Sequence, residues 1–584
     1  LLCADHVVEM GEILSQAGAD GALWGTLAFI LISTVVIAFL FNREHFKNVF
    51  TTDAYHAARN TQGLVALSLS FFASGAGAWV IFTVPEAAIL GGPIALAGYT
   101  ISTLVPVIIF ASVGPYMRRN LPKAFTFFDY VQERYGTLVN IYATLISFFY
   151  MTLYLSAEFK SLGDTYCWLA EGSAETPKDC LYGPVIGTSM VTLVYTAIGG
   201  LPVSLITDKV QGVGIFAFTI LILIAAFTEY PLPGSNTAVS FDNATIVEQN
   251  WELVTSTGTQ GLSNPDDYSQ SVKMAITLIC AVTCANLMHT GFQQRIWAAK
   301  NNKQLLLGAA GGVLLTIPFM CMFGVIGFIA FSNYGNILFA PSYIAFLASF
   351  FVISDTAVGW QVIALILAVL MVASSADTIQ TGAAALMQPI TKLGLGKMGI
   401  VSQPDDPKQQ KLTNFVNFVL AAVVINLPAI VLATDQGNIS TKEVSVLSLF
   451  VLADLACATC IVPLLMGLSH RVHPAAAMVG CATGFTLAMI IYGVGVSGEE
   501  GKYDMLLEAG GLYSDTALTA FIVVPFGSGI MTLLSNIPFY LKGYRFAGFA
   551  DKPGTKVVKG TDTTRTDTTA GEEVVKSAAD TTRA

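Results

Sequence analysis

Three polar groups interrupt apolar stretches of this 584-residue chain, and the first is Val372-Ala373-Ser374-Ser375-Ala376-Asp377-Thr378. Adjacent hydroxyl groups followed by a carboxylate offer hard oxygen ligands, which suit a small hard cation better than a soft metal. The alternative is that the Ser and Thr hydroxyls only hydrogen-bond to carbonyls of their own helix. The segment therefore predicts a cation site, with helix back-bonding as the competing interpretation.

The second group is Ala73-Ser74-Gly75-Ala76-Gly77-Ala78, followed directly by Trp79. Six small residues with two glycines make a poor continuous helix, and unwinding there would expose backbone carbonyls and the ends of two half-helices. Broken helices of this kind bind ions and substrates near the membrane midplane of secondary transporters. Close packing of helices through small residues explains the same pattern, so both interpretations stay open.

The third group is Tyr195-Thr196-Ala197-Ile198-Gly199-Gly200-Leu201, running into Thr207-Asp208-Lys209-Val210-Gln211. The double glycine predicts the end of one helix, and Asp208 is expected to open the next. An acidic residue in a first turn can simply be favoured by the helix dipole. The combination of the glycines with the carboxylate is more informative than either part.

The elements that position these groups are membrane spans. The chain has 29 Lys and Arg and 39 Asp and Glu, so only 12% of it is charged, against roughly 25% in a soluble domain. Its apolar residues reach 54%, which the exterior of a soluble protein of this size cannot accommodate. The net charge of −10 and the lack of a dense basic patch argue against nucleic-acid binding. The composition predicts an all-α polytopic membrane protein.

A spanning helix needs about 20 mostly apolar residues. Thirteen windows meet or approach this requirement: 21–41, 64–91, 94–114, 138–158, 183–200, 209–229, 272–290, 305–332, 359–388, 413–433, 444–468, 475–495 and 516–541. With the N-terminus outside and the C-terminus in the cytoplasm, most Lys and Arg fall on the cytoplasmic side, as the positive-inside rule requires. The external side then keeps only Lys160, Lys178, Lys273, Lys442 and Lys502.

Several features of the expected external loops agree with this orientation. Asn243 and Asn438 begin glycosylation sequons, and Cys167 and Cys180 share the loop 158–182, where a disulfide is permitted. Two loop cysteines can also remain free. At the other end, residues 546–584 are rich in Thr, Asp and Lys and are predicted to form a disordered cytoplasmic tail.

The motif Tyr195-Thr-x-x-Gly-Gly-Leu…Thr207-Asp208-x-x-Gln211 resembles the signature of sodium:solute symporters. Gln294-Arg295 with Ala298-Ala299-Lys300 resembles the basic turn of that family after span seven, and Ala373-Ser374-Ser375 resembles its sodium motif. The similarity extends over about residues 20–540. The three motifs occur in the expected order and topology.

The resemblance implies a leucine-transporter-type core of five plus five helices in inverted repeats. The expected segments are an external segment 1–20, an accessory span 21–41, a first repeat 64–229, a second repeat 272–468, accessory spans 475–541 and a tail 546–584. The implied sodium ligands are the carbonyls of Ala73, Ala76 and Met371 and the hydroxyls of Ser374 and Ser375. By the same resemblance Asp208 lies near the inner ion exit, and Asp377 is a weaker candidate for assisting a second cation.

The expected substrate site lies at the two broken spans, and its candidate residues are Gly75, Gly77, Trp79, Asn286, His289, Thr290 and Gln293. The polar groups on span seven carry no fixed charge apart from a possible imidazolium, which suits a small neutral or zwitterionic solute. His289 is equally well explained as a core histidine.

The sequence therefore predicts a secondary active transporter in which Na⁺ is the coupling ion and no organic cofactor takes part. Urea is the first candidate solute, and a proline-like amino acid is the second. A passive facilitator or channel is the competing class. Phosphate loops, HExxH and GxSxG motifs are missing from the sequence, which argues against an enzyme. The expected location is the plasma membrane, with the solute and the lipid bilayer as partners.

Overall fold

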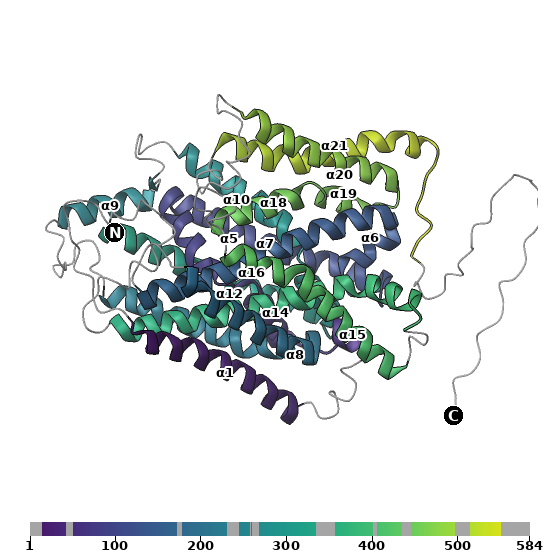
Figure 1. Cartoon of the computed structure of the whole chain (residues 1–584). Helices are drawn as coiled ribbons and strands as arrows, with labels where there is room; N and C mark the ends of the chain where they lie inside the picture. The colour runs from purple at the N-terminus through teal and green to yellow at the C-terminus, as the bar shows by residue number, and fades with distance from the viewer. Residues whose placement is uncertain are drawn as a thin grey trace, which may run out of the picture.

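The computed structural model describes residues 14–41, 51–171, 178–229, 244–256, 258–259, 268–334, 357–400, 406–434, 446–496 and 514–549. Within these residues the regular elements are helices, apart from an isolated bridge between Gln62 and Ala299. Most of the long helices run side by side in one bundle (Figure 1). Ten of them are long and apolar enough to cross a membrane, or eleven if the bent pair Leu449–Ala458 and Ile461–Leu468 counts as one span. The predicted number of thirteen remains a prediction.

The first six windows fall on five helices, because the structure merges some windows and divides another. Window 64–91 is interrupted after Gly75 and is divided between α4 and α5. By contrast, α5 and α8 each run through two windows. The helices of this half are α1 (Gln16–Phe41), α3 (Thr52–Ala57), α4 (Leu64–Gly75), α5 (Trp79–Asn120), α6 (Phe127–Tyr135), α7 (Thr137–Glu171), α8 (Lys178–Glu229) and α9 (Ala244–Ser256).

The second half contains two divided windows: 272–290 is interrupted after Leu287, and 444–468 is bent between Ala458 and Ile461. Its helices are α10 (Ser269–Leu287), α11 (Thr290–Ala298), α12 (Asn302–Tyr334), α14 (Ala357–Lys397), α15 (Pro407–Ala421), α16 (Leu427–Thr434), α18 (Val446–Ala458), α19 (Ile461–Leu465), α20 (Pro474–Val494) and α21 (Asp515–Leu541). A π-helical turn, Ala422–Asn426, joins α15 to α16.

Two long helices are bent at glycines with positive φ, Gly92 in α5 and Gly200 in α8. At Gly200 (φ 58°) a Cβ atom would also lie 2.5 Å from the carbonyl oxygen of Tyr55, so only glycine fits this bend. The expected helix end at the double glycine is thus a sharp bend. The expectation that Asp208 opens the next helix is wrong, because the helical segment resumes directly after Gly200.

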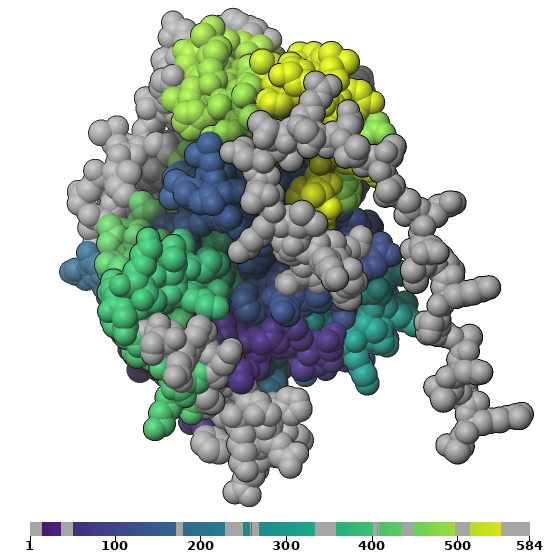
Figure 2. Space-filling model, turned by 90° about the vertical axis from the view of Figure 1, so that its right-hand side faces the viewer, coloured from purple at the N-terminus to yellow at the C-terminus, as the bar shows by residue number. Residues whose placement is uncertain are grey.

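The centre of the bundle is α14, where every residue from 367 to 388 is buried. A helix that is buried on all sides needs other helices around it, and α14 packs against α1, α4, α7, α8, α11 and α15. At the edges, α1 lies along the bottom of Figure 1, and α20 and α21 pack together along the top. Viewed from the end of the bundle, α20 and α21 again form the outermost layer (Figure 2).

Two predicted loop boundaries differ from the structure. The expected external loop 158–182 is mostly helical, because α7 continues to Glu171 and α8 begins at Lys178. The predicted tail begins later than residue 546, since Phe549 is buried and the Phe546 N–H donates to the carbonyl of His470 at 2.8 Å. Residues 550–584 lie outside the described part of the chain.

Candidate functional site

Window 64–91 is the first span of the expected five-plus-five core and is called the first span from here on. It is broken where its small residues predicted. Helix α4 ends at Gly75, Ala76 has φ −85° and ψ 62°, and α5 begins at Trp79. The N–H of Ala76 still bonds back to the carbonyls of Phe72 and Ala73, at 3.0 and 3.2 Å. The last turn of α4 is therefore closed by its own backbone before the chain changes direction.

The predicted ligands on α14 are buried against this broken span. Met371, Ser374 and Ser375 are at most 3% exposed, and α14 packs on α4. The Ser374 hydroxyl donates to Asp208 Oδ1 at 3.1 Å, and the Ser375 hydroxyl donates to Glu158 Oε1. A hydroxyl that donates its proton retains two lone pairs. Both serine oxygens can therefore still act as cation ligands.

Glu158, a residue that the sequence analysis did not select, is a further member of this site. It is buried on α7, and its Oε2 accepts from the N–H of Ala78 at 2.8 Å, at the start of α5. A Cβ atom on Gly77 would lie 1.7 Å from Glu158 Oε1. Gly77, predicted as a substrate contact, thus makes room for this carboxyl group.

Asp208 is the centre of a buried ion pair. Its Oδ2 accepts from Arg295 Nη2 at 2.9 Å and from the Ser70 hydroxyl at 2.5 Å, and the side chains of Asp208 and Arg295 are both fully buried. Arg295 also donates to Ser70 at 2.8 Å and to Thr378 at 3.0 Å. Arg295 was expected in a basic turn after span seven, and that expectation is wrong because its guanidinium lies within the bundle.

Asp377 lies in a separate network of hydroxyl groups. Its Oδ1 accepts from Ser204 at 2.7 Å, and its Oδ2 accepts from Thr207 and Tyr195, both at 3.0 Å. Tyr195 also bonds to the carbonyl of Ala373, at 3.0 Å. The network joins the bend of α8 to α14.

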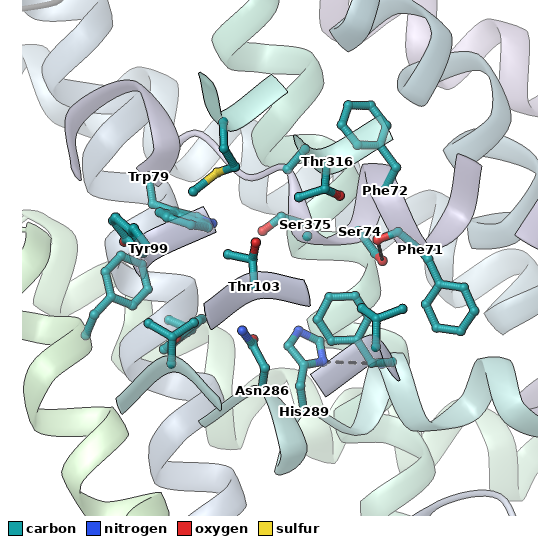
Figure 3. A pocket seen from close by; sticks show the side chains of 18 of the residues that line it. Phe71, Phe72, Ser74, Trp79, Tyr99, Thr103, Asn286, His289, Thr316 and Ser375 are labelled. Atoms are coloured by element: carbon teal, nitrogen blue, oxygen red, sulfur yellow. Dashed lines mark hydrogen bonds between the residues drawn. The ribbon is translucent and has the colours of Figure 1, made fainter. Parts of the chain in front are cut away.

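A cavity opens beside the break in the first span. It contains about 890 Å³ of space between atoms, its mouth included, and Figure 3 shows Trp79 and Tyr99 on one side, Asn286 and His289 on another, and Ser375 near the centre. Two further lining residues are Glu158 and Asp454, and the latter accepts from the Tyr154 hydroxyl at 3.1 Å. Among the described residues that line the cavity, no Lys or Arg occurs.

Aromatic rings form one wall of this cavity. The Trp79 ring lies 5.6 Å from those of Tyr99 and Phe450, and the Tyr154 ring lies 4.3 Å from Phe450, measured between centroids. Rings at these separations pack edge to face or tilted. Because they line the cavity, they offer aromatic surface to a bound ligand. The cavity combines two acidic groups with an aromatic wall.

The predicted substrate residues divide into two groups. Gly75, Trp79, Asn286 and His289 line the cavity, whereas Gly77, Thr290 and Gln293 do not. Thr290 donates to Met151 Sδ at 3.2 Å. Gln293 accepts from the N–H of Phe127 at 2.9 Å and donates to the carbonyl of Leu287 at the same distance. Gln293 therefore connects α11 to α6 and to the end of α10.

Comparison with known proteins identifies the family of this chain. The model of the "Sodium:solute symporter family" matches residues 55–484. The chain belongs to the sodium:solute symporter family. A curated relative, the "Spermidine transporter DUR31" of Candida albicans (strain SC5314 / ATCC MYA-2876), is 26% identical over 533 residues, which are 89% of this chain and 90% of the relative.

A solved structure of another protein has a similar fold. The outward-open, substrate-bound structure of a Na⁺-coupled sialic acid symporter aligns with 91% of this chain and 98% of its own, with a TM-score of 0.65 and 14% identity. The predicted fold class, an all-α membrane protein with a leucine-transporter-type core, is thereby confirmed. Membership of the family supports Na⁺-coupled solute symport, with Na⁺ as the coupling ion, and both the family and the fold are those of transporters.

Two other features of the symporter concern its predicted external side. A disulfide joins Cys167 to Cys180, with their Cα atoms 5.8 Å apart, and links α7 to α8. Both cysteines lie in helices, not in a loop. The predicted glycosylation sites Asn243 and Asn438 lie outside the described residues and remain predictions.

Proposed function

We propose that this symporter uses the Na⁺ gradient across the plasma membrane to import a small organic cation of the polyamine type. The observation that carries the proposal is the pair of acidic residues, Glu158 and Asp454, in an aromatic-walled cavity at the broken first span. The sequence-based preference for a neutral solute considered only the polar groups of span seven, and it did not include these two residues.

Charge balance favours a cation over a neutral solute. An ionised carboxylate away from water is costly unless an opposite charge accompanies it. The described lining of the cavity offers no Lys or Arg for this purpose. An ammonium group would supply the missing charge and make cation–π contacts with Trp79, Tyr154 and Phe450, and the attached alkyl chain would gain apolar contacts with the same rings.

Two further observations bear on the substrate. The Candida relative is named a spermidine transporter, and a polyamine matches the charge of the cavity. Urea and proline remain the competitors, because Asn286 and His289 offer uncharged hydrogen-bonding groups in the same space. Neither of these solutes carries the net positive charge that would balance the two carboxyl groups in their ionised form.

The proposed sodium site lies between the end of α4 and α14. Its ligands are the carbonyls of Ala73, Ala76 and Met371 with the hydroxyls of Ser374 and Ser375. In the proposed cycle, external Na⁺ stabilises an outward-open state, the substrate binds, the bundle rocks, and Na⁺ leaves past Asp208 to the cytoplasm. If Na⁺ tightens substrate binding tenfold, substrate tightens Na⁺ binding tenfold, which corresponds to about 1.4 kcal/mol. Four hydroxyl groups, those of Tyr195, Ser204, Thr207 and Thr378, bond to the Asp377 carboxyl group, and we propose no second cation there.

The orientation belongs to the same proposal. With the N-terminus outside and the C-terminus in the cytoplasm, the excess of Lys and Arg lies on the cytoplasmic side. A membrane potential of 100 mV then adds about 2.3 kcal/mol for each positive charge that moves fully across the membrane. An organic cation carried with Na⁺ therefore enters with the help of both the sodium gradient and the potential.

Uptake by the purified protein in liposomes tests this function. Radiolabelled spermidine, urea and proline are each supplied with and without an inward Na⁺ gradient. We expect spermidine to accumulate above its external concentration only when the gradient is present. Accumulation of urea or proline alone would retain Na⁺-coupled symport and overturn the cationic substrate. Gradient-independent flux of any of the three would indicate a facilitator.

Replacing Ser374 and Ser375 together by Ala is expected to raise the Na⁺ concentration for half-maximal uptake at least tenfold. The reason is that the site loses two of its five proposed oxygen ligands, and hydrogen-bond or ion contacts to charged groups contribute about 1.5–3 kcal/mol each. Initial uptake rates over a range of Na⁺ concentrations give this value. Ser112→Ala is the control, since the Ser112 hydroxyl bonds only to the carbonyl of Ile108 on an exposed helix face. An unchanged Na⁺ requirement in the double variant would refute the site.

A further inference from the structure

We propose that Glu158 belongs to both binding sites, because it positions Ser375 for Na⁺ and also receives the ammonium group of the substrate. The inference rests on the proposed function and adds a residue that joins the ion to the solute. Glu158 is 2% exposed and contacts three different parts of the transport site. These parts are α14, the break in the first span and the cavity.

The contact with α14 makes Glu158 part of the ion site. Its Oε1 accepts the proton of the Ser375 hydroxyl. This bond fixes the direction of the Ser375 oxygen and leaves the lone pairs of that oxygen for a cation, as an outer-shell carboxylate does for a metal ligand. The negative charge also lies one hydroxyl group away from the proposed Na⁺ position. Both effects strengthen Na⁺ binding.

The contact with the break holds the carboxyl group in place. Oε2 accepts from the N–H of Ala78, and Ala78 precedes Trp79, the first residue of α5. An anion at a helix N-terminus is favoured by the free N–H groups and the helix dipole. Gly77 leaves the space that the carboxyl group fills. Glu158 therefore connects α7 to the break and to α14 through a single side chain.

The third contact is with the cavity itself. Glu158 and Ser375 both line it, together with Trp79 and Asp454. The two carboxylates, Glu158 and Asp454, then balance one Na⁺ and one ammonium group of the polyamine, and its remaining ammonium groups are left to the aromatic wall of the cavity. Glu158 faces both cations, whereas Asp454 is held by Tyr154 on the α18 side of the cavity.

This difference makes Asp454 the matched comparison. Both residues are buried carboxylates that line one cavity, but Ser375 donates to Glu158. Glu158→Gln is expected to weaken Na⁺ binding and spermidine binding, whereas Asp454→Asn is expected to weaken spermidine binding alone. A purely structural defect would not separate the two ligands in this way.

The test measures binding of radioactive Na⁺ to the purified full-length protein without substrate, and binding of spermidine at saturating Na⁺. For Glu158→Gln we expect the dissociation constants of both ligands to rise at least tenfold. For Asp454→Asn we expect a similar rise for spermidine and a change of less than twofold for Na⁺. Ser161→Ala, one turn further along α7 with its hydroxyl bonded to the carbonyl of Ala157, is expected to change neither.

Glu158→Asp is the second variant, because it keeps the charge and shortens the side chain. We expect its Na⁺ dissociation constant to lie between those of the wild-type protein and Glu158→Gln and at least about twofold above the wild-type value, because the charge stays but the shortened side chain reaches Ser375 less well. This rise can be measured even if the Gln variant does not fold. An unchanged Na⁺ dissociation constant in both Glu158 variants would overturn the inference. If the wild-type protein does not bind spermidine, the proposed substrate fails, and the Na⁺ measurement on Glu158→Gln and Asp454→Asn still decides whether Glu158 serves the ion site.

Discussion

Replacing Arg295 by Met, or Asp208 by Asn, is expected to leave little folded protein, because each change removes one partner of a fully buried ion pair. The Arg295 guanidinium bonds to Asp208, Ser70 and Thr378, and it also donates to the carbonyl of Gly291 at 2.5 Å. Loss of one partner of a buried pair costs about 3–5 kcal/mol, since the other charge remains buried without compensation. That is comparable to a large part of the stability of a typical domain.

The double variant Asp208→Asn/Arg295→Met separates this explanation from a general packing defect. Neutral groups of similar volume can replace a buried pair at little cost, and sometimes with a gain in stability. We therefore expect the double variant to recover more than half of the melting temperature lost in the worse single variant. Size-exclusion chromatography and thermal unfolding in detergent give the folded fraction and the midpoint. Single variants as stable as the wild-type protein would contradict the prediction.

The ion pair also changes how the predicted ion exit is interpreted. The resemblance implied that Asp208 lies near the inner ion exit. In the structure Arg295 already neutralises it, and Ser374, a proposed Na⁺ ligand, donates to the same carboxyl group. Na⁺ that passes this point would meet a carboxylate already engaged by a guanidinium. The melting temperature of the double variant therefore tests the ion pair's role in folding. Its Na⁺-driven uptake tests the role of Asp208 in Na⁺ exit, and the two are measured separately.

The sequence predicted the fold well because its strongest signals are local. Apolar length, the glycine-rich break before Trp79 and the double glycine at 199–200 each act on a few neighbouring residues, and the structure has a break or a bend at both glycine positions. Span ends were less accurate. Window 138–158 ended at Glu158, where hydropathy falls, although α7 continues to Glu171 because its last turns pack inside the bundle.

The polar contacts were harder to predict, since they join helices that are far apart in sequence. Arg295 was interpreted as a loop charge, and nothing nearby in the sequence indicates that Asp208 neutralises it. For two residues a usable signal existed. Asp454 is an acidic residue inside an apolar window, and such residues usually mark functional positions. Tyr150, Tyr154 and Glu158 follow at intervals of four, which places them on one face of a helix.

Substitution of Gly77 by Ala is expected to abolish most Na⁺-driven uptake while leaving the protein folded. The added Cβ atom would lie 1.7 Å from Glu158 Oε1 and 2.5 Å from its Cδ, distances at which the carboxyl group has to move. Glu158 is a long side chain, so it can move without unfolding the bundle, although overpacking of this kind typically costs 1–3 kcal/mol. The movement would break its bonds to Ala78 and Ser375.

The measurements are Na⁺-driven spermidine uptake and the melting temperature of the purified variant. We expect uptake to fall at least tenfold, with a melting temperature close to that of the wild-type protein. Gly394→Ala is the control, because a Cβ atom on this α14 glycine would have no neighbour within 4 Å and Gly394 does not line the cavity.

A second-site change tests the physical reason for the loss. Shortening the obstructed side chain in Gly77→Ala/Glu158→Asp creates room for the added methyl group and retains the charge beside Ser375. If displacement of the carboxyl group causes the defect, the double variant transports better than Gly77→Ala alone. If the two changes are independent, it transports worse than either single variant, and the break at Gly77 then acts through its backbone rather than through Glu158.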